Sequence, residues 1–220
     1  MRTFESIFGQ VYYGFSNLAA NEAAQTWALL QALTNLNNVN IQFFCDDPWL
    51  KDTDPDGDVL TSSGHWYWDG RPVGSTDGWV DLSTTNACRN NANLAGFTYP
   101  NLNGYDVVTM CQRRMSGWVD SWNSGITLTS LRLQGAQPTS FYSLDDYRPL
   151  ISVTLLHELT HCAGIFTSSY GFFKDSQCDM GGTSLTAYGW NCISKMGQDS
   201  SSEAALNNAG RLYYLSPASA

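Results

Sequence analysis

The spacing of apolar residues predicts three helices. Between residues 16 and 36, apolar positions recur at intervals of three and four with no glycine or proline among them, which is typical of a helix packed on a core. Residues 150–164 have the same spacing and end at Gly164, a residue suited to the left-handed position after a helix. A last helix is expected over residues 200–215, where Ser200 and Glu203 have capping-box spacing.

Several shorter segments have the patterns of strands. Residues 41–45 (IQFFC) and 105–111 (YDVVTMC) predict strands, and residues 126–134 predict a half-buried strand or an irregular edge. In residues 64–75 we expect a hairpin around Asp69 and Gly70, because that dipeptide readily adopts the positive φ angles of a tight turn. No internal repeat or linker divides the chain, so we expect one domain over residues 1–220.

The composition restricts the partners and the compartment. Eleven basic and twenty acidic residues leave a net charge of −9, which argues against binding to nucleic acid or to anionic membranes. The six cysteines include no C-x-x-C pair, so neither a cysteine zinc site nor a thioredoxin-type motif is indicated. An even number of cysteines in an acidic, lysine-poor chain favours three disulfides and a secreted protein over six reduced thiols, and their pairing stays open.

Residues 155–165 (LLHELTHCAGI) contain the strongest candidate for chemistry. His157 and His161 are four positions apart, so on a helix their imidazoles share one face and can bind a single zinc ion. Glu158 follows the first histidine and can accept a proton from a zinc-bound water as that water attacks a peptide carbonyl. Two histidines and a glutamate in an apolar helix would be costly to bury without such a purpose, which favours a zinc site over a chance match.

A catalytic zinc site needs a third protein ligand, which the motif does not contain. The metzincin pattern is excluded, because Thr167 stands where its last histidine would be. Glu203 is the only later glutamate, and its capping position is a poor place for a ligand. The remaining candidates are Asp175 and Asp179, with His65 as a distant alternative.

The C-terminal third of the chain resembles the aspzincins, the deuterolysin and peptidyl-lysine metalloendopeptidase family of secreted zinc proteases. The resemblance rests on LLHELTHCAGIF, GTSLTAYGW and LNNAGRLYYL, with weaker echoes in IQFFC and VVTMC. It implies a zincin-like domain with His157 and His161 as ligands, Glu158 as the general base and Tyr188 as a residue that stabilises the oxyanion. An aspartate from a later segment would complete the metal site.

Two departures from the family pattern concern this aspartate. None occurs in GTSLTAYG, where the family carries it, and N-A-G replaces the family's N-A-D. We therefore expect the ligand to lie upstream, at Asp179, which is nine residues before Tyr188 and is anchored by its neighbour Cys178 if that cysteine is bridged. Asp175 is the reserve candidate.

Two other segments carry weaker signals. Asp52 to Asp58 (DTDPDGD) have the alternating carboxylates of a calcium loop, but Ser63 stands at position twelve in place of a bidentate glutamate. A calcium-stabilised surface loop there competes with an acidic, solvated turn. HWYWDG, at residues 65–70, could form an aromatic platform for a sugar, or could line a core or one face of a hairpin.

These features together predict an α+β fold: a helix-rich, zincin-like single domain with a small β-sheet and disulfide-tied loops. We expect a secreted, monomeric zinc endopeptidase that binds one zinc ion and hydrolyses peptide bonds in protein or peptide substrates. No nucleic acid and no membrane is expected as a partner. The alternative is a zincin-fold protein with weak or no catalytic activity that acts in binding or in host interaction.

Overall fold

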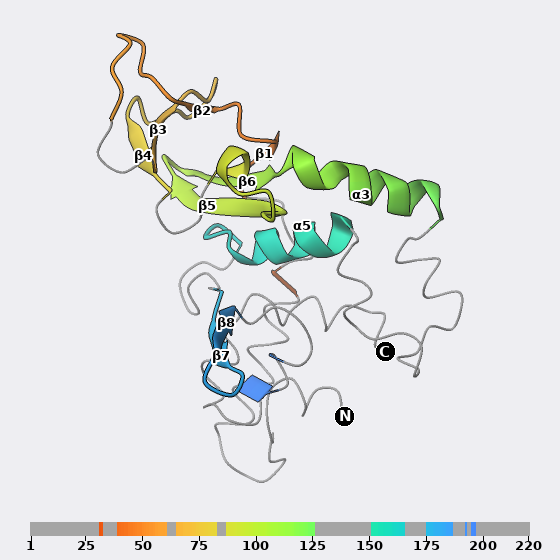
Figure 1. The fold of residues 1–220 in the computed structure, drawn as a ribbon. Helices are drawn as coiled ribbons and strands as arrows, with labels where there is room; N and C mark the ends of the chain where they lie inside the picture. The colour runs from red at the N-terminus through yellow and green to blue at the C-terminus, as the bar shows by residue number, and fades with distance from the viewer. Residues whose placement is uncertain are drawn as a thin grey trace.

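The structure is a computed structural model of the chain, and it describes residues 31–32, 39–60, 65–82, 87–125, 151–165, 175–186, 192 and 195–196 (Figure 1). Most of the elements with defined bounds in these residues are strands. In chain order they are β1 (Ile41–Cys45), β2 (Leu50–Lys51), β3 (Trp66–Asp69), β4 (Trp79–Asp81), the 3-10 helix η1 (Cys88–Asn90), β5 (Gly96–Leu102), β6 (Tyr105–Met110), α3 (Gln112–Asn123), α5 (Ile151–Thr160), β7 (Gln177–Asp179) and β8 (Ser184–Thr186).

The largest unit is a three-stranded sheet in the order β1-β6-β5. The middle strand β6 runs parallel to β1 and antiparallel to β5. Its residues Val107, Val108 and Thr109 are fully buried, as expected for a central strand with apolar and β-branched side chains. Asn103 and Gly104 both have positive φ angles and form the tight turn between β5 and β6. The strands predicted from IQFFC and YDVVTMC are therefore confirmed.

A second three-stranded sheet, β2-β3-β4, corrects the predicted hairpin. Strand β3 pairs with β4, so the chain returns at Trp79 and does not turn back at Asp69 and Gly70. The carboxylate of Asp69 instead accepts hydrogen bonds from Arg71 and from the Thr76 N–H, which hold a longer connection. Gly70 is needed for close packing, because an added Cβ would lie 3.0 Å from the carbonyl oxygen of Trp49. Tertiary contacts thus give this turn dipeptide a different role from the one that its local pattern predicts.

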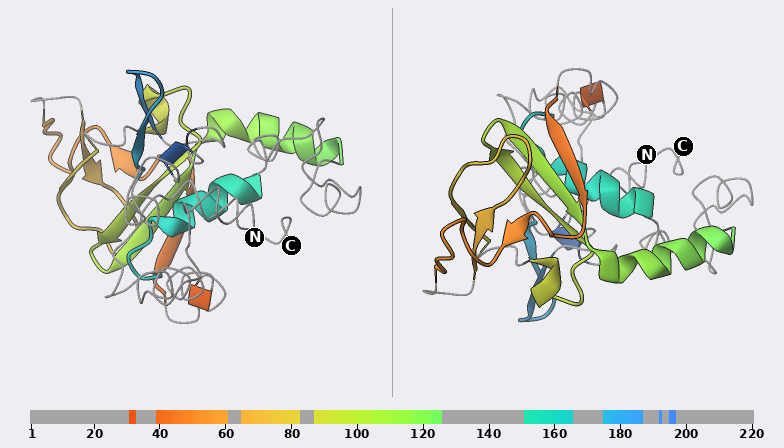
Figure 2. Two further views of the ribbon diagram at one scale, coloured as in Figure 1. Left: turned by 90° about the horizontal axis from the view of Figure 1, so that it is seen from below. Right: turned by 90° about the horizontal axis from the view of Figure 1, so that it is seen from above.

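Helix α5 lies across one face of the β1-β6-β5 sheet, and the views from above and below agree on this placement (Figure 1, Figure 2). A buried apolar cluster joins the sheet, α3 and the segment after α5; it consists of Val108, Met110, Trp118, Cys162 and Ile165. A second cluster, which includes Trp49, Leu50, Leu82 and Phe97, joins the two sheets. Burial of these side chains fixes the helix against the sheet.

The expectation of a helix-rich fold is wrong for the described residues, which form mostly β-sheet and contain two α-helices with defined bounds. The sequence between residues 39 and 110 is rich in aromatic and β-branched residues separated by Asp, Asn and Gly, and these form more strands than expected. Of the helix predicted at residues 16–36, only residues 31–32 are described, and they are helical. The predicted helix at 200–215 and the predicted strand at 126–134 lie outside the described residues.

Two disulfides join Cys88 to Cys111 and Cys178 to Cys192, while Cys45 and Cys162 are unbridged. The prediction of three disulfides is therefore wrong by one pair. Disulfide bonds fit an extracellular or secreted protein. Within the part of the chain that is described, no helix has the length and apolar character needed to cross a membrane.

Candidate metal centre

Helix α5 and the turn after it bring the two histidines of HELTH together. The helix ends at Thr160, four residues before the predicted end at Gly164, and His161 lies in a tight turn closed by its N–H donating to the carbonyl of Glu158 at 3.0 Å. Gly164 does not have a positive φ angle, so it is not the expected left-handed cap. The Nε2 atoms of His157 and His161 lie 3.3 Å apart, and the two rings are nearly perpendicular. The prediction that a helix carries the motif is therefore confirmed for residues 157–160, whereas His161 lies in the turn after the helix.

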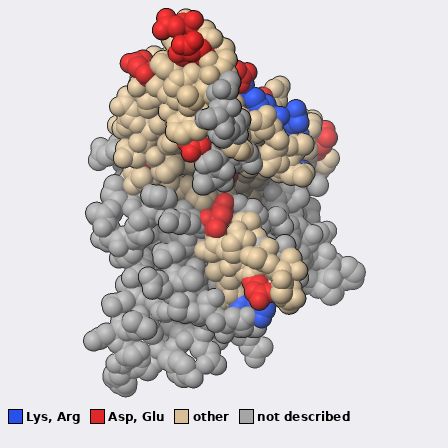
Figure 3. All heavy atoms as spheres, turned by 60° about the vertical axis from the view of Figure 1, so that its left-hand side comes forward, with Lys and Arg blue, Asp and Glu red and all other residues tan. Residues whose placement is uncertain are grey.

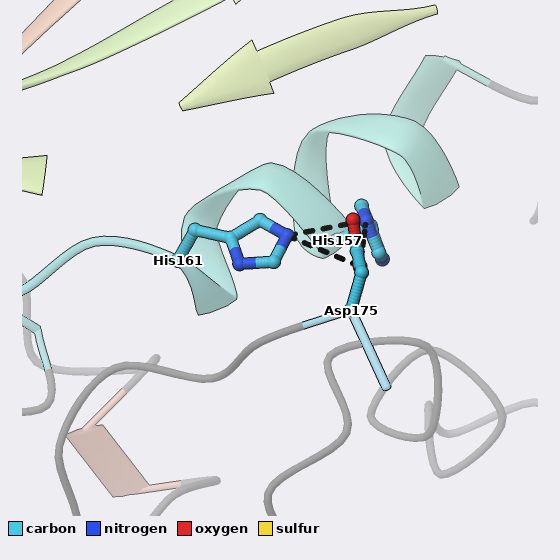
Figure 4. A group of neighbouring side chains, drawn as sticks. All are labelled: His157, His161 and Asp175. Atoms are coloured by element: carbon cyan, nitrogen blue, oxygen red, sulfur yellow. Dashed lines mark hydrogen bonds and ion pairs between the residues drawn. The ribbon is translucent and has the colours of Figure 1, made fainter. Parts of the chain in front are cut away.

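Asp175 completes a three-residue group with these histidines (Figure 4). Its Oδ1 lies 3.3 Å from Nε2 of His157 and 3.5 Å from Nε2 of His161. Burial alone would raise the pKa of Asp175, but hydrogen bonds to both histidines outweigh burial and hold that pKa well below its ordinary value. About a third of the Asp175 side chain remains exposed, so the group can be reached from solvent.

The spacing of these three atoms suits a metal ion. Their separations are 3.3, 3.3 and 3.5 Å. Ligands about 2.0 to 2.1 Å from a tetrahedral ion are about 3.3 to 3.4 Å from each other. Two imidazole nitrogens and one carboxylate oxygen are also a common ligand set for first-row metals. The group formed by His157, His161 and Asp175 can therefore hold a metal ion.

Asp179, the residue preferred from the sequence, is not part of this group. It ends β7, and its Oδ1 accepts a hydrogen bond from the N–H of Gly182 at 2.6 Å in the turn to β8. Asp179 lies four positions after Asp175 along the chain, at the far end of β7. The structure therefore places Asp175, the reserve candidate, beside the two histidines, whereas the Asp179 carboxylate lies in the β7–β8 turn.

Glu158 lies on the sheet side of α5 and is 5% exposed. Oγ1 of Thr98, on β5, lies 2.9 Å from the Glu158 carbonyl oxygen and 3.0 Å from its Oε2, and donates its hydrogen to one of them. An added Cβ at Gly96 would lie 3.3 Å from Oε1, so glycine lets β5 pass close to the carboxylate. Burial raises the pKa of Glu158, and the nearby His157 and His161 offset part of that rise.

The calcium hypothesis for Asp52 to Asp58 is not supported by this geometry. Oδ1 of Asp54 accepts hydrogen bonds from the N–H groups of Asp56 and Asp58, and Asp52 pairs with Arg89. Among the described residues, this loop forms no group of three converging carboxylates. The loop is therefore the acidic turn that was the alternative, and acidic side chains gather at one end of the face shown in Figure 3.

The other sequence candidates lie away from the metal group or outside the described residues. His65 is half-buried, its carbonyl accepts the N–H of Leu82, and it does not join the group. In the HWYWDG segment Tyr67 is buried in the core, while the half-buried Trp68 packs edge-on against Trp79 on the opposite face of the sheet. Tyr188 lies outside the described residues.

Sequence reasoning missed Thr98, because a lone threonine in a strand has no distinguishing pattern. It also ranked Asp175 too low, because no spacing rule relates that residue to the motif. A scan against protein-family models gave no matching family, and searches of curated proteins and of solved structures gave no match. The geometry of the described residues is therefore the basis for any functional conclusion.

Proposed function

We propose that the protein is a secreted zinc-dependent metalloendopeptidase in which His157, His161 and Asp175 hold one zinc ion. The observation that carries this proposal is the triangle of 3.3, 3.3 and 3.5 Å between their ligand atoms, which matches the edges of a tetrahedral zinc site. A bound zinc ion would supply a water of lowered pKa and a Lewis acid for the substrate carbonyl. Three protein ligands leave the fourth position for that water.

Glu158 takes the part of general base in this proposal. It directly follows one ligand, and its carboxylate interacts electrostatically with all three members of the group. A carboxylate whose pKa is raised by burial is a better proton acceptor than an exposed glutamate, because its basicity is closer to neutral pH. The Thr98 hydroxyl lies within hydrogen-bond distance of both the carboxylate and the carbonyl of Glu158 and so helps to hold the residue in place, which supports proton transfer without a large rearrangement.

The proposed substrate is a protein or peptide, acted on by a monomer. HELTH on a helix is the arrangement in which a zinc protease pairs two ligands with a base, and this supports peptide hydrolysis over other zinc chemistry. The net charge of −9 argues against nucleic acid as a partner. The two disulfides support an extracellular setting.

The test is a metal analysis of the purified protein combined with cleavage of an unfolded protein substrate. We expect about one zinc per chain, loss of cleavage on chelation, and recovery on adding zinc. Glu158→Gln should keep its zinc and lose about 100- to 10,000-fold in kcat, because the amide cannot accept the proton. As the matched control, Asp179→Asn should keep both zinc and activity.

The outcomes separate the alternatives. Zinc bound without cleavage would replace the protease with a zinc-containing binding protein, and wild-type activity in Glu158→Gln would remove Glu158 from the mechanism. A wild-type protein that binds no zinc would overturn the whole proposal.

A further inference from the structure

Asp106, on β6, joins the sheet to the turn that carries His161. The residue is buried, with 3% of its surface exposed. Oδ1 accepts hydrogen bonds from the N–H of Asn101 at 2.8 Å and of Ala163 at 3.1 Å, and Oδ2 accepts from the N–H of Gly164 at 2.7 Å. One carboxylate thus connects β5, β6 and the segment after α5. Successive N–H groups such as those of Ala163 and Gly164 form a small anion-binding concavity.

The two histidines are held in different ways. His157 lies inside α5, where the helical backbone and its packing on the sheet hold it. His161 lies past the end of the helix, and its own backbone is held by the 3.0 Å bond from its N–H to the Glu158 carbonyl. Two residues further on, the chain is fixed to the sheet by Asp106. The position of His161 relative to His157 therefore depends on this attachment.

We propose that Asp106 is a positioning residue for the metal centre: by binding the N–H groups of Ala163 and Gly164, it holds the turn so that Nε2 of His161 keeps its place in the ligand triangle. This inference rests on the proposed zinc binding. It assigns to Asp106 no contact with the metal or with a substrate. Asp106 acts through His161 alone.

Gly164 supports the same conclusion from the other side of the contact. An added Cβ would lie 3.0 Å from Oδ2 of Asp106 and 2.7 Å from Cγ1 of Val39. Both distances are shorter than ordinary van der Waals contact, so the turn could not sit this close to the carboxylate with a larger residue. Glycine is needed at this position because the backbone lies so close to Asp106 and Val39. A positive φ angle is not the reason, since Gly164 does not have one.

The first test is Asp106→Asn, measured by competition with a chelator for zinc. Asparagine has one acceptor oxygen and one NH₂ group, so at least one backbone N–H would face a donor in place of an acceptor. We expect zinc affinity to fall about 10- to 100-fold, the range found when groups that orient metal ligands are changed. The visible absorption bands of bound Co²⁺ should also change in intensity, because they report coordination geometry.

Asp69→Asn is the matched control. Asp69 is also a buried aspartate that accepts backbone N–H groups, from Arg71 and Thr76, but it belongs to the β2-β3-β4 sheet. This variant should lower the thermal midpoint while zinc affinity and the Co²⁺ spectrum stay at wild-type values. A loss of zinc affinity in both variants would reduce the role of Asp106 to general stability.

Gly164→Ala provides a second test that leaves the Asp106 carboxylate intact, and it decides the matter if Asp106→Asn does not fold. It should lower zinc affinity and alter the Co²⁺ spectrum in the same direction. Wild-type zinc affinity and spectrum in a folded Asp106→Asn or Gly164→Ala variant would overturn the inference. If the wild-type protein itself binds no zinc, the proposed function fails first, so the two failures are distinguishable.

Discussion

Two buried carboxylates, Asp69 in the β2-β3-β4 sheet and Glu158 in α5, have opposite electrostatic settings. The side chains of Asp69 and Arg71 have no exposure, and their charged atoms lie 2.8 Å apart. Burial alone would raise the pKa of Asp69, but hydrogen bonds from Arg71 and the backbone outweigh it and lower that pKa. Burial instead dominates at Glu158 and raises its pKa. Within the described ranges, no lysine or arginine pairs with Glu158.

The difference distinguishes a buried ion pair from a group of residues that could hold a metal ion. Arg71 also donates to the carbonyls of Gly74 and Leu102 and to Oε1 of Gln42, so the Asp69 group is closed within the protein. Around Glu158, two histidines and Asp175 gather with ligand atoms facing one point. A divalent cation there would balance the carboxylates as Arg71 balances Asp69, and perturbed pKa values of this kind cluster at functional sites.

The largest effect is expected when the ion pair between Asp69 and Arg71 is broken. Arg71→Ala would leave Asp69 buried without its counter-charge, and we expect the free energy of unfolding to fall by about 3 to 5 kcal/mol. Denaturant titration measures this loss. Arg113→Ala, which removes an exposed arginine from α3, is the control and should change the free energy by less than about 0.5 kcal/mol. A small effect of Arg71→Ala would contradict the structural role of the pair.

The next effect concerns the third ligand. Asp175→Ala should raise the zinc dissociation constant more than about 100-fold, beyond the range for groups outside the ligand set. Asp179→Ala should change it little, because Asp179 accepts a hydrogen bond from Gly182 in the β7–β8 turn. Chelator competition measures both constants. The reverse ranking would restore Asp179 as the ligand and refute the assignment of Asp175.

A smaller effect, which depends on pH, tests how far a negative charge on the buried Glu158 carboxylate lowers the free energy of unfolding. Because the folded-state pKa of Glu158 is raised, the folded protein binds the proton more tightly than the unfolded chain. The free energy of unfolding of the metal-free protein should therefore fall as pH rises from the ordinary glutamate value through the raised pKa. Each tenfold difference in proton affinity between the folded and unfolded states corresponds to about 1.4 kcal/mol. The Glu158→Gln variant has no titrating group at this position, so its free energy of unfolding should not show this fall.

Denaturant titrations of metal-free wild-type protein and Glu158→Gln across this pH range measure the difference. The stability of Glu158→Gln relative to wild type should increase with pH and then level off. A difference that is independent of pH would mean that folding leaves the pKa of Glu158 unchanged, and it would contradict this prediction.

The smallest effect concerns Thr98. Thr98→Val removes the hydroxyl that holds Glu158, and we expect a loss of about 1 kcal/mol in unfolding free energy together with a lower kcat at unchanged KM. Thr109→Val, which removes the acceptor of the Trp49 indole N–H, is the control and should lose similar stability while keeping kcat. Equal kcat values in the two variants would remove Thr98 from the description of the site.

Local patterns predicted two strands of the central sheet and the helix that carries His157. The strands β1 and β6 and the helix α5 follow from short-range apolar spacing, and the spacing of four residues places His161 one turn beyond His157, just past the end of the helix. The expectation of a helix-rich fold was wrong because whether an aromatic or β-branched segment forms a strand depends on the partners that it has in the sheet. The sequence alone does not show those partners. The strands β3 and β4, for example, pair across residues 70–78, where glycine, proline and an Asp-Gly pair predict turns but do not specify which one closes the pair of strands.

The sequence by itself determined that His157 and Glu158 lie on a helix with His161 one turn further along the chain, because this depends on short-range spacing. The tertiary structure decided which aspartate meets them, since Asp175 and Asp179 are equivalent as residue types and differ only in where the chain places them. It also decided the roles of Asp106 and Gly164, whose contact joins segments 58 residues apart. Contacts of that range depend on how the sheet and helix pack, and no local pattern encodes them.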